Sequence, residues 1–183
     1  PQVIDATGLI VAPGFIDPHT HALRGIFDVP NAESALLQGV TTLTEGNDGS
    51  SPYPIDRHYA DIQDLRISPN WAVFVGQGTI RQRVIGFGLR KASPQEMDRM
   101  KQMVRDAMEQ GALGISTGLF YVPGSFTSTE EVIELSKVAA EYNGIYISHI
   151  REEAAQLIDS VQETIRIGEE AGIPVQITHH KVI

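Results

Sequence analysis

Cysteine is absent from the sequence, which excludes disulfide bonds and thiolate metal ligands and is typical of a cytoplasmic protein. The chain begins at Pro1 rather than at a methionine, so this expectation leaves a signal peptide open. Basic residues are few, since 14 Lys and Arg stand against 23 Asp and Glu. Such a chain has no basic stripe to neutralise nucleic-acid phosphates, and no apolar run approaches the roughly 20 residues of a membrane span. We therefore expect neither nucleic acid nor a membrane as a partner.

A GxGxxG motif after the first predicted strand is also missing, which disfavours a dinucleotide-binding fold. The chain contains instead six apolar, strand-like runs separated by amphipathic segments. The runs are Leu9 to Ile16, Thr41 to Thr44, Trp71 to Val75, Ala112 to Ser116, Gly144 to Ser148 and Pro174 to Thr178. This alternation predicts an α/β fold with parallel strands. Because a complete barrel needs eight strands and typically about 250 residues, we expect a partial TIM-type (β/α)8 barrel with about six of the eight strands.

The amphipathic segments carry helix start and stop signals. Ser93-Pro94-Gln95-Glu96 has the pattern of an N-cap, a proline at the first helical position and a capping-box glutamate. Methionines at helical spacing then predict a core-facing helix that stops at Gly111. Thr127 with Glu130 predicts a second capping box. A third helix is expected from about Glu152 to Ala171, and His58 is expected on the exposed surface of another.

Histidines gather where the predicted strands end. His19 and His21 follow the first strand, and His149, His179 and His180 follow the fifth and sixth, so five of the six histidines lie at carboxyl ends of strands. In parallel α/β folds these ends meet on one face and carry the chemistry. Imidazoles converging on one place are typical of a site for zinc or a similar divalent ion.

Two carboxylates at the end of the second predicted strand complete this donor set. A pair of metal ions needs a bridging anion, and no lysine that could be carbamylated stands at the end of the fourth strand. Glu45 and Asp48 are therefore the candidates for the bridging ligand. We expect one or two Zn²⁺ ions, which in hydrolases polarise a carbonyl and lower the pKa of water.

The chain resembles the amidohydrolase superfamily and, within it, the N-acyl-D-amino-acid deacylases (D-aminoacylases). The resemblance is carried by Ile4-Asp-Ala-Thr-Gly, Ala12-Pro-Gly-Phe-Ile-Asp-Pro-His-Thr-His, Gly39-Val-Thr-Thr, Gly111-Ala-Leu-Gly-Ile-Ser-Thr-Gly-Leu-Phe-Tyr, His149-Ile-Arg and Ile177-Thr-His-His-Lys. The first two segments are typical of the whole superfamily. The later ones are more specific to the deacylases, and together the segments span nearly the whole chain.

The resemblance implies a role for each matching residue. His19 and His21 would hold the more exposed ion, and His149 and His179 the other. The deacylases usually have cysteine where this chain has Asp48, which favours Asp48 over Glu45 as the strand-two ligand without excluding Glu45. Substrate carboxylate would be held by Tyr121 and Lys181, with Arg151 as a second cation. Gln77 stands where the deacylases usually have histidine, so an acid or base role is not expected there.

The implied activity is metal-dependent cleavage of the N-acyl bond of N-acyl-D-amino acids, which are small-molecule substrates. The general base of the superfamily is an aspartate after strand eight, expected beyond Ile183, so residues 1–183 alone are expected to be inactive. Residues 1–8 would be a remnant of a small β-sandwich domain and residues 9–183 the N-terminal portion of the barrel. Two alternatives remain at this point: a cyclic-amide hydrolase of the dihydroorotase or hydantoinase kind, and a metal-free barrel acting as a scaffold.

Overall fold

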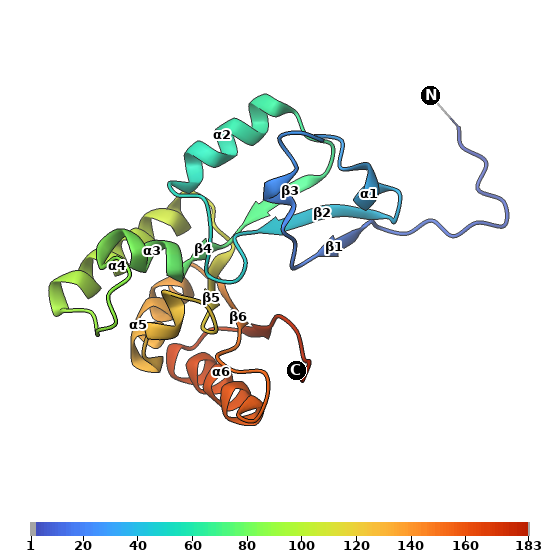
Figure 1. The fold of residues 1–183 in the computed structure, drawn as a ribbon. Coiled ribbons are helices and arrows are strands. Elements are labelled where there is room, and N and C mark those ends of the chain that lie inside the picture. The colour runs from blue at the N-terminus through green and yellow to red at the C-terminus, as the bar shows by residue number, and fades with distance from the viewer. Residues whose placement is uncertain (1–2, 183) are drawn as a thin grey trace.

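The computed structural model describes residues 3–182 as an α/β fold (Figure 1). The strands are β1 (Phe15–Asp17), β2 (Val40–Glu45), β3 (Asn70–Val73), β4 (Val75–Gly76), β5 (Gly114–Gly118), β6 (Ile145–His149) and β7 (Val175–Ile177). The α-helices are α1 (Glu33–Leu36), α2 (Ile55–Leu65), α3 (Gln77–Val84), α4 (Pro94–Glu109), α5 (Thr129–Ala140) and α6 (Leu157–Ala171). Two 3-10 turns, η1 (Ala22–Arg24) and η2 (Gly124–Phe126), complete the described elements.

All strand pairs of residues 3–182 are parallel, in the orders β1-β2-β3 and β4-β5-β6-β7. The two sheets meet at residues 73–75. The Phe74 N–H donates to the Glu45 carbonyl at 2.7 Å, and the Leu113 N–H donates to the Val73 carbonyl at 2.8 Å. β3 and β4 therefore occupy the one strand predicted over Trp71 to Val75, interrupted at Phe74. No closed sheet forms among the described residues.

The main core lies between the strands and the helices that follow them. Val75, Ile115 and Tyr146 from the strands and Met100 and Leu135 from α4 and α5 are all fully buried. Figure 1 shows α2, α4, α5 and α6 following one another around one side of the strands. Burial of such side chains contributes about 1.5–3 kcal/mol each, so this layer holds the carboxyl ends of the strands in place.

The predicted helix signals agree with the structure in part. The Ser93 hydroxyl accepts from the Glu96 N–H in a full capping box, so the predicted start of α4 is confirmed. The start predicted for α5 is wrong by one residue, because Ser128 rather than Thr127 is the N-cap. α6 ends at Gly172, as predicted, but begins at Leu157 rather than near Glu152.

The strand predicted over Leu9 to Ile16 is wrong for most of its length. Only Phe15–Asp17 pairs with β2, and Ile10 is 94% exposed. Pro13 has no N–H to donate to a neighbouring strand, and residues 9–14 pair with no strand of the described chain. Figure 1 shows the N-terminal stretch running away from the sheet. Residues 1 and 2 of the expected β-sandwich remnant lie outside the described residues.

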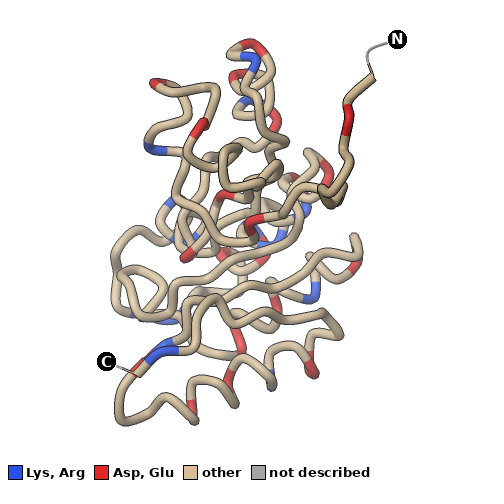
Figure 2. The backbone as a smooth tube through the Cα atoms, turned by 90° about the vertical axis from the view of Figure 1, so that its right-hand side faces the viewer, with Lys and Arg blue, Asp and Glu red and all other residues tan. Residues whose placement is uncertain are grey.

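The distribution of charge and the hydropathy of the helices can be compared with the expectation that neither nucleic acid nor a membrane is a partner. In the view of Figure 2, Lys and Arg are dispersed along the chain, while Asp and Glu recur along the helices. Within residues 3–182, no helix is both long and apolar enough to cross a membrane.

Candidate metal centre

The loop that carries His19 and His21 is fastened to β2 by hydrogen bonds. The Thr20 N–H and hydroxyl both donate to the Thr44 carbonyl, at 3.2 and 2.8 Å. The Thr20 hydroxyl also lies 2.6 Å from a Glu45 carboxylate oxygen. These bonds hold the loop between the two histidines, and the Nε2 atoms of His19 and His21 lie 3.3 Å apart. The two imidazoles thus converge, although both lie beyond the end of β1.

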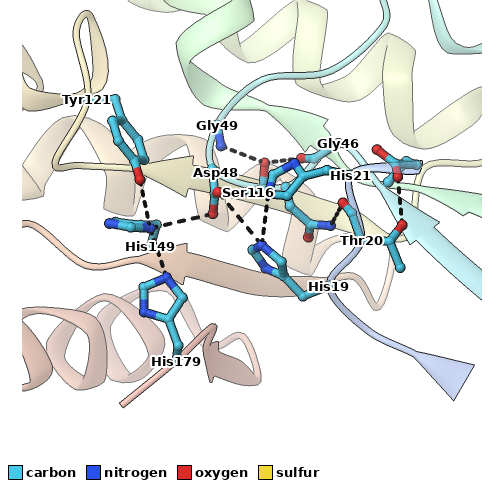
Figure 3. Close-up of polar contacts among 12 residues, drawn as sticks. His19, Thr20, His21, Gly46, Asp48, Gly49, Ser116, Tyr121, His149 and His179 are labelled. Carbon is cyan, nitrogen blue, oxygen red and sulfur yellow. Dashed lines mark hydrogen bonds and ion pairs between the residues drawn. The ribbon is translucent and has the colours of Figure 1, made fainter. Parts of the chain in front are cut away.

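A tight turn after β2 aims Asp48 at these histidines. Gly46, Asp48 and Gly49 all have positive φ, at 80°, 54° and 75°. Aspartate tolerates this conformation better than most residues, whereas a Cβ at Gly46 would lie 2.0 Å from the Phe74 carbonyl oxygen. The Ser116 hydroxyl of β5 donates to the Gly46 carbonyl and accepts from the Gly49 N–H (Figure 3). The turn is therefore fixed by a neighbouring strand as well as by its own glycines.

Asp48, His19 and His21 form one group of possible metal donors, called here the outer group. The Asp48 Oδ2 atom lies 3.3 Å from His21 Nε2 and 3.7 Å from His19 Nε2. The His21 side chain is 56% exposed, so this group faces solvent. Burial lowers the pKa of His19, which favours the neutral imidazole that metals bind.

His149, Glu153 and His179 form a second group, called here the inner group. His179 lies just past β7, and its Nε2 and Nδ1 atoms lie 3.0 Å from His149 Nδ1 and 2.7 Å from Glu153 Oε1. His149 and Glu153 are buried. Burial lowers the pKa of His149. Glu153 was missed by the sequence analysis, which placed it inside a helix; an acidic residue shortly after a strand-end histidine was the available signal.

The two groups meet at Asp48 (Figure 3). While its Oδ2 atom faces the outer group, its Oδ1 atom lies 3.8 Å from Nδ1 of His149. The Tyr121 hydroxyl lies 3.5 Å from the same His149 nitrogen, and nearby Asp48 and Glu153 add to burial in raising the pKa of Tyr121. One carboxylate from the turn after β2 thus lies between imidazoles from the loop after β1 and from the end of β6.

Unpaired buried atoms test whether a metal fits here. Three side-chain atoms of the two groups are buried without a hydrogen-bond partner: Nδ1 of His19, Oδ1 of Asp48 and Nε2 of His149. Leaving such groups unpaired costs about 1–3 kcal/mol each. Nitrogen and carboxylate donors in sets of three match the ligand sets of catalytic zinc. The residues present therefore fit a zinc or similar divalent centre.

Three other predicted site residues, Glu45, Lys181 and Arg151, belong to neither group of donors, and only Lys181 contacts one. Glu45 is buried outside both; burial raises its pKa, and the hydrogen bond from Thr20 opposes that shift. Lys181 contacts the inner group, with Nζ 3.1 Å from a Glu153 oxygen. Arg151 is held elsewhere, by two contacts of 2.9 and 2.7 Å to the Glu163 carboxylate.

A cavity of about 720 Å³ adjoins the outer group. His21, Asp48 and Tyr121 line it, so an occupant would reach the donors from this side. Glycines let its walls approach closely, since a Cβ at Gly118 would lie 2.2 Å from the Asp48 carbonyl oxygen. The cavity is large enough for a small organic substrate.

A family model described as "Amidohydrolase family" matches residues 2–183. The chain belongs to the amidohydrolase family. It is 38% identical over 203 residues to the D-aminoacylase of Alcaligenes xylosoxydans xylosoxydans, a match covering 98% of this chain and 42% of that protein. With donors at the ends of parallel strands, this amidohydrolase chain has the fold of D-aminoacylase structures.

Two solved structures illustrate the likeness of this amidohydrolase chain. An N-acyl-D-glutamate deacylase from Bordetella bronchiseptica, complexed with zinc and a phosphonate inhibitor, superposes with a TM-score of 0.88 at 33% identity. A D-aminoacylase described as having a binuclear metal centre superposes with a TM-score of 0.83 at 34% identity. Each match covers 93% of this chain and 41% of the other. The chain thus spans about two fifths of the length of these relatives.

Proposed function

We propose that the intact protein is a metal-dependent deacylase that hydrolyses N-acyl-D-amino acids to a D-amino acid and a carboxylate. The observation that carries this proposal is the pair of three-residue donor groups at the ends of parallel strands beside a cavity, with Asp48 of the outer group also facing His149 of the inner group. Similarity to D-aminoacylase and to a zinc-containing N-acyl-D-glutamate deacylase supports the reaction class.

In this proposal His19 and His21 would hold one zinc ion, His149 and His179 would hold a second, and Asp48, which faces both pairs of histidines, would be the strand-two ligand. Glu153 is the carboxylate of the inner group, a role the sequence analysis did not assign. Zinc in such a site polarises a carbonyl and lowers the pKa of water. We propose that an aspartate of the intact protein acts as the general base, as the family resemblance implies, so the proposal concerns the intact protein.

The chain's own polar groups would hold the substrate. Tyr121 lines the cavity and reaches His149, so its hydroxyl is placed to donate to a substrate carboxylate or acyl oxygen. Lys181 supplies a positive charge beside the inner group. Arg151 donates to the carbonyls of Ser125 and Thr127 as well as to Glu163. Its proposed contribution is therefore to fix the loop that follows Tyr121, with any contact to substrate requiring Glu163 to release it.

For the architecture we propose that β1 to β7 are consecutive strands of a partial TIM-type (β/α)8 barrel. In this barrel β3 and β4 count as one strand. The parallel pairing and the bonds that join the two sheets at residues 73–75 support this. In the same proposal residues 9–183 are the N-terminal portion of the barrel and residues 1–8 belong to a small flanking β-sandwich.

The proposal is tested with the zinc-loaded intact protein. We expect it to release D-methionine from N-acetyl-D-methionine and to leave N-acetyl-L-methionine, dihydroorotate and hydantoin intact. Release of amine is measured by chiral chromatography, and bound zinc by atomic absorption.

Turnover of the cyclic amides in place of N-acetyl-D-methionine would assign the protein to the hydantoinase and dihydroorotase kind of enzyme. A pure protein that binds no zinc and hydrolyses none of the four compounds would be a scaffold, contrary to the proposal.

A further inference from the structure

Arg24 stands at the mouth of the metal centre. It is the last residue of η1, the 3-10 turn that directly follows His21, and its side chain lines the 720 Å³ cavity with His21 and Asp48. The Gly25 and Ile26 N–H groups both donate to the Ala22 carbonyl, at 2.9 and 2.8 Å. Ile26 is only 2% exposed, so this turn is anchored in the body of the fold. The backbone that presents Arg24 is therefore fixed.

The cavity is otherwise short of positive charge. Arg24 is the one Lys or Arg among its lining residues, and it forms no ion pair within residues 3–182. The carboxylates in the lining are engaged with other groups: Glu45 accepts from Thr20, and Asp48 faces the histidines. The guanidinium of Arg24 is thus available to an occupant of the cavity.

The two cations that the sequence analysis assigned to the substrate are placed differently. Arg151 and Lys181 are absent from the lining of the cavity, and both contact protein carboxylates, Glu163 and Glu153. An anionic group of a molecule bound in the cavity would therefore contact Arg24 rather than Arg151 or Lys181. The planar guanidinium fork matches a carboxylate with two parallel hydrogen bonds.

We propose that Arg24 binds a carboxylate of the substrate and so determines which N-acyl amino acids the cavity accepts. The inference rests on the proposed function. The carboxylate has two chemical sources, the α-carboxylate present in every N-acyl amino acid and the side-chain carboxylate of an acidic one. Gln82 lines the same cavity, and its side-chain amide suits either source.

The test compares Arg24→Gln, Arg24→Lys and a control, Arg99→Gln, in the zinc-loaded intact protein. Arg99 is exposed on α4 and lies outside the cavity lining. The substrates are N-acetyl-D-leucine, N-acetyl-D-glutamine and N-acetyl-D-glutamate. Loss of a charged hydrogen bond predicts that Arg24→Gln lowers kcat/KM about 10- to 100-fold, chiefly through KM. Arg24→Lys keeps the charge and should lose less, and Arg99→Gln should match the wild type.

The substrates distinguish the two sources of the carboxylate. Equal losses on all three assign Arg24 to the α-carboxylate, and a loss confined to N-acetyl-D-glutamate assigns it to the side chain. Arg24→Gln within about twofold of Arg99→Gln on every substrate overturns the inference. Unchanged melting temperatures would show that the variants fold normally.

A binding measurement separates this inference from the proposed function. N-acetyl-D-glutamate is titrated calorimetrically into the metal-free protein and its variants. Binding at least tenfold weaker in Arg24→Gln than in Arg99→Gln supports the carboxylate site even if the wild type hydrolyses nothing, a result that would overturn only the proposed reaction. Equal binding by the two variants overturns the carboxylate site itself.

Discussion

The outer and inner groups use similar donors but are held in different ways. The His21 side chain is 56% exposed and stays in place through the bonds that fasten its loop to β2. The side chains of His149 and Glu153 are 4% and 2% exposed and are held by the packing around β6. An exposed site supported by a loop exchanges its ligands with solvent more readily than a buried one. The comparison therefore predicts two zinc ions of unequal retention, the outer one lost first to a chelator.

The largest expected effect comes from Asp48, which belongs to the outer group and also faces His149 of the inner group. Asp48→Asn removes the charge that faces both sets of histidines, so zinc affinity should fall at both. Changes just outside a metal's ligands cost about 10- to 100-fold in affinity, and loss of a ligand itself should reach or exceed that range. Zinc titration of the intact protein, followed by atomic absorption, measures the effect.

Glu45→Gln is the matched control for Asp48→Asn. Glu45 touches the loop through Thr20 and lies outside both groups. Its variant should keep the wild-type number of zinc ions and lose less affinity than Asp48→Asn, because Glu45 acts only through Thr20. Loss of an ion from Glu45→Gln, with Asp48→Asn unaffected, would reverse the assignment of the strand-two ligand.

In the absence of metal, a substitution in the inner group should lower the free energy of unfolding more than a substitution in the outer group. Glu153 is buried and contacts His179 and Lys181, so Glu153→Gln should lower the free energy of unfolding by about 1–3 kcal/mol. His21→Ala, at an exposed position, should cost less than about 0.5 kcal/mol. Urea unfolding of both variants of the intact protein with EDTA present gives the two values. Equal costs would mean that burial does not distinguish the groups.

The last expected effect concerns the strand that carries His149 of the inner group, and it is absent at neutral pH because it appears only in alkali. Burial raises the pKa of Tyr146 in β6 to about 12, whereas a tyrosine in the unfolded chain titrates near 10. Between these values the unfolded chain has lost a proton that the folded chain keeps. Stability should therefore fall as pH rises from about 10 to 12, by at most about 1.4 kcal/mol per pH unit.

Tyr146→Phe tests the source of that slope. The variant loses the contact between the Tyr146 hydroxyl and Thr117 and should be less stable at neutral pH. Its stability should nevertheless depend less on pH above 10 than that of the wild type, in urea unfolding curves recorded from pH 9 to 11.5. Parallel slopes for the two proteins would exclude Tyr146 as the cause.

Local signals in the sequence predict the helices better than the first strand. The capping box at Ser93 is confirmed because its bonds lie within four residues. The strand expected from Leu9 is wrong because pairing depends on a partner strand, which the pattern of apolar residues does not reveal. His58 illustrates the same limit: it lies in α2, as predicted, but is buried and accepts a hydrogen bond from Trp71, far along the chain.

For the site, the sequence identifies the strand ends that carry histidine and not the contacts between them. The sequence names His19 and His21, but both lie past the end of β1, and they converge because Thr20 fastens their loop to β2. Asp48 likewise depends on a left-handed turn that Ser116 fixes from another strand. Glu153 could not be placed because the residues before α6 form turns rather than the predicted helix. The assignment of all these residues as metal ligands stays a prediction until zinc is measured.

The contacts of Glu153 also connect the inner group to the segment that follows β7. Its two oxygens contact His179 and Lys181, which belong to a segment after β7 without regular secondary structure. A cation held by the inner group would relieve the crowding of donors there and, through His179, draw that segment against β6. Zinc uptake and docking of this segment are then one linked equilibrium, so that protease sensitivity near residue 180 would report whether the inner group is occupied.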